Sequence, residues 1–185
     1  MSRTLLASIL VVLTLSGIAW SADEKPKDSS SEASLIGGRL TFTPPPDDAW
    51  ARATNVNADD AAAYGARDEK GAIAIQVLPA DAEMTPQMGG AVVRSLRDAH
   101  KKANQNIVYG PKVEPDKRFA LKVHEKYQVG EKTADELHLY RNVGPRVVMV
   151  TVNAWVTDDA AAKPVHQAGE DVLASAKWAP SAKKK

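Results

Sequence analysis

RVVMVTVNAWV, residues 146–156, is the stretch that decides how this sequence folds. Its apolar side chains occupy both odd and even positions, whereas a strand with one face in water alternates apolar and polar residues. We therefore expect a central strand that is covered on both faces. A sheet built around such a strand needs a packing element on each side, and the rest of the sequence supplies two candidate helices.

Other strands are expected on the N-terminal side of this run. They are short stretches with β-type patterns, separated by turn-forming residues: 39–43, 61–67, 72–78, 107–113, 119–129 and 136–142. The loops 130–134 and 142–145 have hairpin length. The last two strands and 146–156 are therefore predicted to form an antiparallel meander.

Two segments have a helical period. Thr85 and Pro86 predict a helix start, with threonine as the N-cap and proline at the first helical position, and apolar residues then recur every three or four positions as far as Ala103. The second helix is expected to begin at Pro164, because proline inside a helix begun at Asp158 would break it. One helix on each face of an antiparallel sheet predicts an α+β domain, an α/β/α sandwich.

The order of these elements resembles the PsbP-like fold family. The resemblance rests on an opening strand followed by proline and tryptophan, from Phe42 to Trp50, on the mid-chain helix and meander, and on a final helix that runs into ASAKW at 174–178. These features are fold elements, so the resemblance transfers no site residue. It implies a PsbP-like fold and a binding or assembly module, usually without catalytic activity.

The opening stretch itself, LTFTPPPDDAW at residues 40–50, has the composition of a polyproline ligand followed by two acids. Its first residues alternate as in a strand, and proline cannot continue the hydrogen-bond ladder of a sheet. We therefore interpret the stretch as a strand, a turn and a return of Trp50 to the core.

Both ends of the chain differ in composition from the middle. Arg3, the apolar run after it and the small residues around Trp20 predict a secretory signal peptide over 1–21, cleaved between Ser21 and Ala22. An uncleaved anchor is the alternative, but the run is shorter than the ~20 apolar residues of a spanning helix. A periplasmic or secreted protein, with no integral membrane segment after cleavage, is expected.

The remaining segments follow from composition. The predicted organisation is a flexible linker over 22–36, a single α+β domain over 37–178 and a disordered basic tail over 179–185. The chain has 24 basic and 23 acidic side chains and no cysteine. This balance does not favour a nucleic-acid partner, and the absence of cysteine excludes disulfides, thiolate metal sites and cysteine nucleophiles.

Candidate chemistry centres on the histidines, which are His100, His124, His138 and His166. If 130–134 closes a hairpin, His124 and His138 lie on adjacent strands and can share a face, where they could bind a metal. Glu125 is expected to point to the other face. Lysines flank His124 and would repel a cation, so two unrelated surface histidines are the favoured interpretation, and no catalytic, cofactor-binding or metal residue is predicted.

The function that the sequence favours is an exported, non-enzymatic binding or assembly module of the bacterial envelope, with a protein or small ligand as its partner. A metal-dependent or hydrolase-like enzyme is one alternative, and a protein that contacts envelope lipid or cell wall is another. No serine-elbow or nucleotide-binding glycine pattern is present, so no cofactor is expected. The acid pairs 47–48, 59–60 and 158–159 are interpreted as turn and cap residues.

Overall fold

The computed structural model describes residues 32–54, 56, 58–79, 82–156 and 158–179. The predicted signal peptide and its cleavage site, linker residues 22–31 and tail residues 180–185 lie outside the described residues. Linker residues 32–36 are described, and they do not follow the prediction. Strand β1, Ala33–Leu35, pairs with the next strand and buries Leu35, so ordered structure begins earlier than the composition indicates.

A seven-stranded antiparallel sheet forms the centre of the fold, in the order β3-β4-β5-β9-β8-β7-β6. Its strands are β3 (Trp50–Arg52), β4 (Ala61–Ala66), β5 (Gly71–Val77), β6 (Ile107–Glu114), β7 (Leu121–Val129), β8 (Lys132–Val143) and β9 (Arg146–Ala154). A smaller sheet places β2 (Leu40–Phe42) between β1 and β10 (Lys177–Trp178). The meander prediction is confirmed by the antiparallel pairing of β7 with β8 and of β8 with β9.

Strand β9 lies between β5 and β8, in the middle of the sheet. Val148, Val150 and Val152 belong to one hydrophobic core, while Val147 and Met149 belong to a second core on the opposite face. The expectation of a central strand covered on both sides is therefore confirmed.

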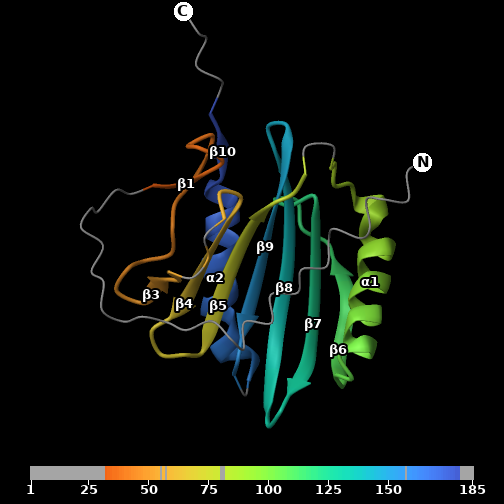
Figure 1. The fold of residues 1–185 in the computed structure, drawn as a ribbon. Coiled ribbons are helices and arrows are strands. Elements are labelled where there is room, and N and C mark those ends of the chain that lie inside the picture. The colour runs from red at the N-terminus through yellow and green to blue at the C-terminus, as the bar shows by residue number, and fades with distance from the viewer. Residues whose placement is uncertain (1–31, 55, 57, 80–81, 157, 180–185) are drawn as a thin grey trace, which may run out of the picture.

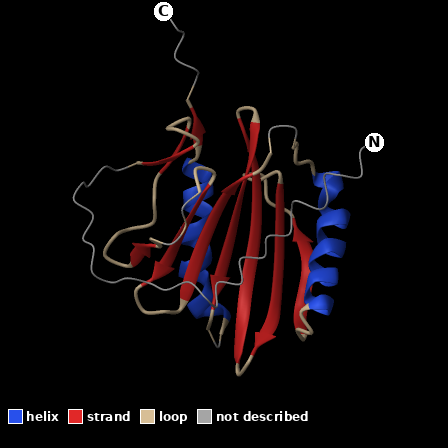
Figure 2. Ribbon diagram, viewed as in Figure 1, coloured by secondary structure: helices blue, strands red, loops and turns tan. Residues whose placement is uncertain are grey.

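Each core is closed by a helix (Figures 1 and 2). Helix α2 (Asp159–Ser175) packs on β9, β8 and β5, whereas α1 (Gly89–Lys102), preceded by the 3₁₀ turn η2 (Pro86–Met88), packs on β6 and β7. In the view of Figure 1, α2 lies behind the sheet and α1 stands beside β6. The predicted α+β architecture, with helices on both faces of an antiparallel sheet, is confirmed.

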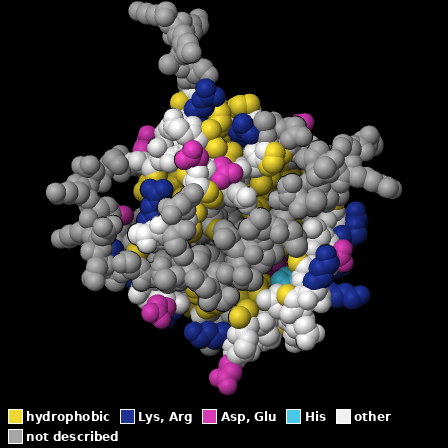
Figure 3. All heavy atoms as spheres, viewed as in Figure 1, with side chains coloured by type: hydrophobic (Ala, Val, Ile, Leu, Met, Phe, Trp, Pro, Cys, Tyr) yellow, Lys and Arg dark blue, Asp and Glu magenta, His cyan; other side chains and the backbone are white. Residues whose placement is uncertain are grey.

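The basic residues of α1 lie on its outer side. Arg97, Lys101 and Lys102 are exposed, and Figure 3 shows basic side chains along the right-hand edge of the molecule, where α1 lies. Val92 and Leu96 face inward and are buried. The helix is thus amphipathic, as its period predicts.

Helix α2 begins earlier than predicted. The Asp158 side chain accepts a hydrogen bond from the Ala161 backbone N–H at 2.7 Å, and Pro164 lies inside the helix. Placing the start at Pro164 was wrong, because the cap and the burial of Ala162 and Val165 against the sheet offset the missing proline donor. The cap interpretation of this acid pair is confirmed.

The opening stretch 40–50 follows the predicted path. Strand β2 ends before the prolines, and the Trp50 N–H then donates to the Pro46 carbonyl at 2.9 Å. The Trp50 side chain is buried in the same core as Phe42 and Tyr64.

Candidate functional site

The histidines occupy two clusters on opposite faces of the β7–β8 hairpin. Strand register places His124 opposite Leu137, and Val123 opposite His138. His124 and His138 therefore do not share a face, which rules out the alternative of a metal bound between them; the favoured interpretation of two unrelated histidines holds, except that His138 is buried rather than on the surface. The loop contains only Gly130 and Glu131, not the five residues 130–134, and changing a loop by an odd number of residues reverses which faces meet.

Glu125 shows the same register effect. It was expected to point away from a histidine site, yet its Oε1 lies 2.9 Å from His138 Nε2. Lys122, His124 and Lys126 do share the other face, as the alternation predicts. The hairpin thus carries one group of ionisable side chains toward α1 and another toward α2.

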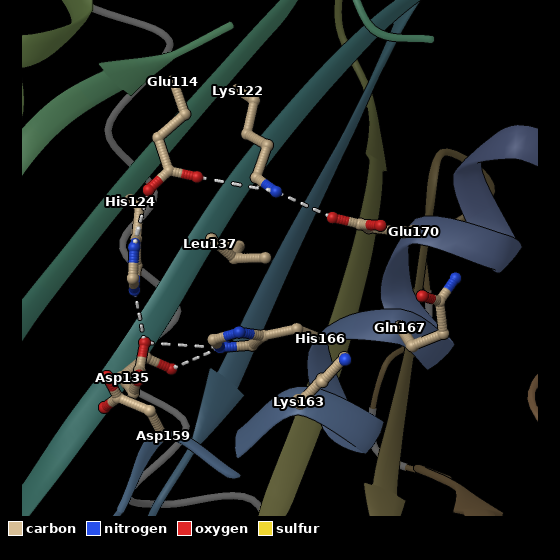
Figure 4. A pocket seen from close by; sticks show the side chains of 10 residues that line it. All are labelled: Glu114, Lys122, His124, Asp135, Leu137, Asp159, Lys163, His166, Gln167 and Glu170. Carbon is tan, nitrogen blue, oxygen red and sulfur yellow. Dashed lines mark hydrogen bonds and ion pairs between the residues drawn. The ribbon is translucent and has the colours of Figure 1, made fainter. Parts of the chain in front are cut away.

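The group on the α2 side lines an open pocket of about 360 Å³, which we call the α2-face pocket. Its lining residues come from β6, β7, β8 and α2: Glu114, Lys122, His124, Asp135, Leu137, Asp159, Lys163, His166, Gln167 and Glu170. Figure 4 shows these side chains converging from the strands on one side and the helix on the other.

Asp135 is the centre of this pocket. Its Oδ1 lies 2.6 Å from His124 Nε2 and 3.4 Å from His166 Nε2, and its Oδ2 lies 3.0 Å from Lys126 Nζ. Burial alone would raise the pKa of the Asp135 carboxyl, but the hydrogen bonds from His124 and Lys126 outweigh it and the pKa is lowered. The group is therefore a carboxylate at neutral pH.

The two pocket histidines have pKa values shifted in opposite directions. Burial lowers the pKa of His124, but hydrogen bonds to Asp135 and to Glu114, 2.9 Å from Nδ1, outweigh burial and the pKa is raised. For His166, burial dominates and the pKa is lowered. The pocket therefore favours an imidazolium at His124 and a neutral imidazole at His166.

Glu170 anchors the other end of the pocket. Its Oε1 accepts from Lys122 Nζ at 2.9 Å and its Oε2 accepts from Arg118 Nη2 at 2.6 Å. Lys163 and Gln167, one helical turn apart on α2, line the pocket (Figure 4) and are exposed. The lining contains no serine, threonine or cysteine, so it offers no side-chain hydroxyl or thiol nucleophile.

The group on the α1 side is enclosed. We call it the α1-face cluster, and its members are His100, Glu125, Tyr127, Glu136 and His138. The carboxylates of Glu125 and Glu136 are 1% and 6% exposed. Burial raises the pKa of Glu136, whereas the two histidines outweigh burial at Glu125 and lower its pKa to about 2.

Several of these residues were not singled out in the sequence. His100 follows Val92 and Leu96 at intervals of four, a spacing that already places it on the buried face of the helix. Asp135 and His166 carry no local signal, because they come together only when α2 packs on β8.

Comparison of the sequence with protein-family models and with curated proteins gives no match. Comparison with solved structures does. The Saccharomyces cerevisiae Ran-binding protein Mog1p matches with a TM-score of 0.54 and 13% identity, over 80% of this chain and 94% of that chain. Cyanobacterial PsbP (CyanoP) from Synechocystis matches with a TM-score of 0.52 and 10% identity, over 84% of this chain and 97% of that chain.

These similarities define the class of protein: an α+β protein with a PsbP-like fold. At these identities the comparison extends to the fold alone. Among the described residues, none of the helices has the length and apolar character needed to cross a membrane.

Proposed function

We propose that the chain is an exported, non-enzymatic binding module of the bacterial envelope, and that its ligand contacts the α2-face pocket. The expected signal segment supports export, and 37–178, extended by β1, supplies the single mature domain. The fold supports a binding role, since a protein with a similar fold is described as Ran-binding. Fold similarity does not name a ligand, so the ligand class must come from the pocket.

The observation that carries the proposal is the mixed charge of the pocket, whose lining has no side-chain hydroxyl or thiol. Carboxylates at Glu114 and Asp159 and ammonium groups at Lys122 and Lys163 border one cavity. Asp159 has a side chain that is 85% exposed. Exposed charges rearrange around a ligand at low free-energy cost, because water already screens them. A small ligand that carries both an ammonium and a carboxylate group matches this lining.

A free dipeptide such as Ala-Ala is the simplest probe of that chemistry. N-acetyl-Ala-Ala-amide is the matched control, because it keeps the side chains and lacks both terminal charges. In amide NMR spectra of the purified protein, Ala-Ala is expected to shift pocket resonances and the blocked dipeptide is not. Equal shifts with both probes, or shifts confined to residues outside the pocket, contradict the proposal.

Lys163→Ala is the informative variant, because Lys163 lines the pocket and is exposed. Losing an exposed charge pair of up to about 1 kcal/mol weakens binding by roughly fivefold. Lys101→Ala, on the outer face of α1, is the control and leaves the affinity unchanged. Equal affinities in the two variants contradict the assignment of the pocket.

The enzyme and envelope-contact alternatives predict different experimental results. Turnover of a peptide or ester panel that is abolished by Asp135→Asn supports the enzyme alternative. Retention of the mature protein in the membrane fraction at high salt supports the lipid or cell-wall alternative.

A further inference from the structure

The α1-face cluster has the spacing of metal ligands. His138 Nε2 lies 2.9 Å from Glu125 Oε1 and 3.3 Å from Glu136 Oε1. One ligand atom from each of these residues lies within 4.8 Å of the others. In a tetrahedral zinc site, ligand atoms about 2.0–2.2 Å from the metal are separated from each other by about 3.3–3.6 Å. The observed separations require only small side-chain adjustments.

His100, on α1, lies beside this group, but the ligand atoms that are all within 4.8 Å of one another are those of Glu125, Glu136 and His138. His100 Nε2 lies 2.9 Å from Glu125 Oε2. A protonated His100 is the ionic partner of that oxygen, which accepts no other hydrogen bond. Asn153 Oδ1, on the residue paired with Glu136 in the sheet, is a second buried acceptor without a partner. Buried oxygens without a hydrogen bond are rare in folded proteins, and both of these could accept from a cation bound in the cluster.

Groups outside this set already hold its members in position. His100 Nδ1 lies 2.8 Å from Gln105 Oε1, so an Nδ1–H can donate to the amide oxygen, and Nε2 becomes a possible ligand atom when it is deprotonated. The Tyr127 hydroxyl donates to Glu136 Oε2. Metal-bound histidines and carboxylates are typically oriented by such outer hydrogen bonds.

We propose that the α1-face cluster is a structural site for a zinc-type divalent cation, held by Glu125, Glu136 and His138, with His100 completing the set by a shift of its side chain. Two carboxylates and two neutral imidazoles carry a total charge of minus two, which balances the charge of a bound divalent cation. Calcium and magnesium prefer six or more oxygen ligands, which this set does not provide. Four protein ligands in a closed interior are typical of a structural site rather than a catalytic one.

The site is independent of the function proposed for the α2-face pocket. It joins α1 to β7 and β8, because His100 lies on the helix and the other ligands lie on the strands. The competing arrangement has no metal, and protons on both imidazoles neutralise the carboxylates. In that arrangement, zinc has no effect on the folded protein.

The test measures zinc content and thermal unfolding of the full-length purified protein, refolded with zinc and dialysed into metal-free buffer. About one zinc ion per chain is expected, together with a higher Tm than that of the zinc-free protein. Glu136→Gln keeps the shape of the side chain and removes its charge, so it is expected to weaken zinc binding about 100-fold or more. Replacing tetrahedral zinc with cobalt is expected to give the visible absorption of a four-coordinate ion.

His166→Gln, in the α2-face pocket, is the matched control and is expected to bind zinc as the wild type does. If His138→Gln fails to fold, Glu136→Gln and His100→Gln still test the site. Substoichiometric zinc in the wild type overturns the proposal. So does zinc that is retained by Glu136→Gln and His100→Gln, or zinc that is lost on His166→Gln.

Discussion

The two faces of the β7–β8 hairpin carry similar side chains in different surroundings. His124 and Glu125 are neighbours in sequence, but His124 points to an open pocket and Glu125 to a closed cluster under α1. Where water is excluded, each charged side chain needs an oppositely charged or hydrogen-bonding side chain beside it, so removing a member of the cluster is expected to lower the stability of the fold. Where water enters, the charges remain available to a ligand, so the pocket is suited to binding.

The largest difference in stability between the two faces is expected when one carboxylate is removed from each face in turn. Glu125→Ala leaves two buried imidazoles without their shared partner, and breaking a buried ion pair costs about 3–5 kcal/mol. Glu114→Ala removes a partly exposed partner of His124 and costs about 1 kcal/mol or less. Urea unfolding of both variants measures the difference. Similar losses would remove the distinction between a closed and an open face.

A smaller effect tests how the helices cover the two faces. A Cβ at Gly169 would lie 2.1 Å from Val152 Cγ2, so α2 lies directly against β9. Gly169→Ala is expected to destabilise the fold by about 1–3 kcal/mol through overpacking. On α1, a Cβ at Gly90 would meet nothing closer than Arg94 Nη1 at 3.7 Å. Gly90→Ala is therefore expected to be neutral or to stabilise the fold by up to about 1 kcal/mol, as thermal unfolding would show.

The smallest effect concerns pH and the pocket. Burial lowers the pKa of His166 in the fold, below the unfolded value of about 6.5. As the pH falls below the unfolded pKa, His166 binds a proton in the unfolded chain but not yet in the folded protein. This favours unfolding, and the stability that neutral His166 contributes is lost progressively until the pH reaches the folded pKa. The wild type is expected to lose more stability than His166→Gln between about pH 7 and pH 5. Parallel pH dependence of the two proteins contradicts the neutral assignment.

The architecture could be predicted from the sequence because the spacing of apolar residues indicates which side chains are buried. The apolar residues of 146–156 identified the central strand, and Val92 and Leu96 identified the buried side of α1. The sequence did not predict which histidines meet, because that depends on a two-residue turn at Gly130 and Glu131. A single-residue change in loop length exchanges the two faces, and composition does not specify that length.

The candidate sites were less predictable than the fold for a related reason. Asp135 meets His166 only across the α2–β8 contact, and Glu125 meets His100 only across the α1–β7 contact. The start of α2 was predicted too late for the same reason. Pro164 disfavours a helix locally, but the packing of Val165 in the core stabilises the helix around it. Local pattern predicted elements, whereas tertiary packing decided which polar groups converge.

The most direct test of two separate polar sites is NMR of the histidine rings during zinc titration. With the protein in its folded state, up to one equivalent of zinc is expected to shift the ring signals of His100 and His138 and to leave those of His124 and His166 in place. The shifts should saturate at about one equivalent, as for a closed four-ligand site. Shifts at His124 and His166 instead, or uniform weak shifts of every ring, would contradict the account.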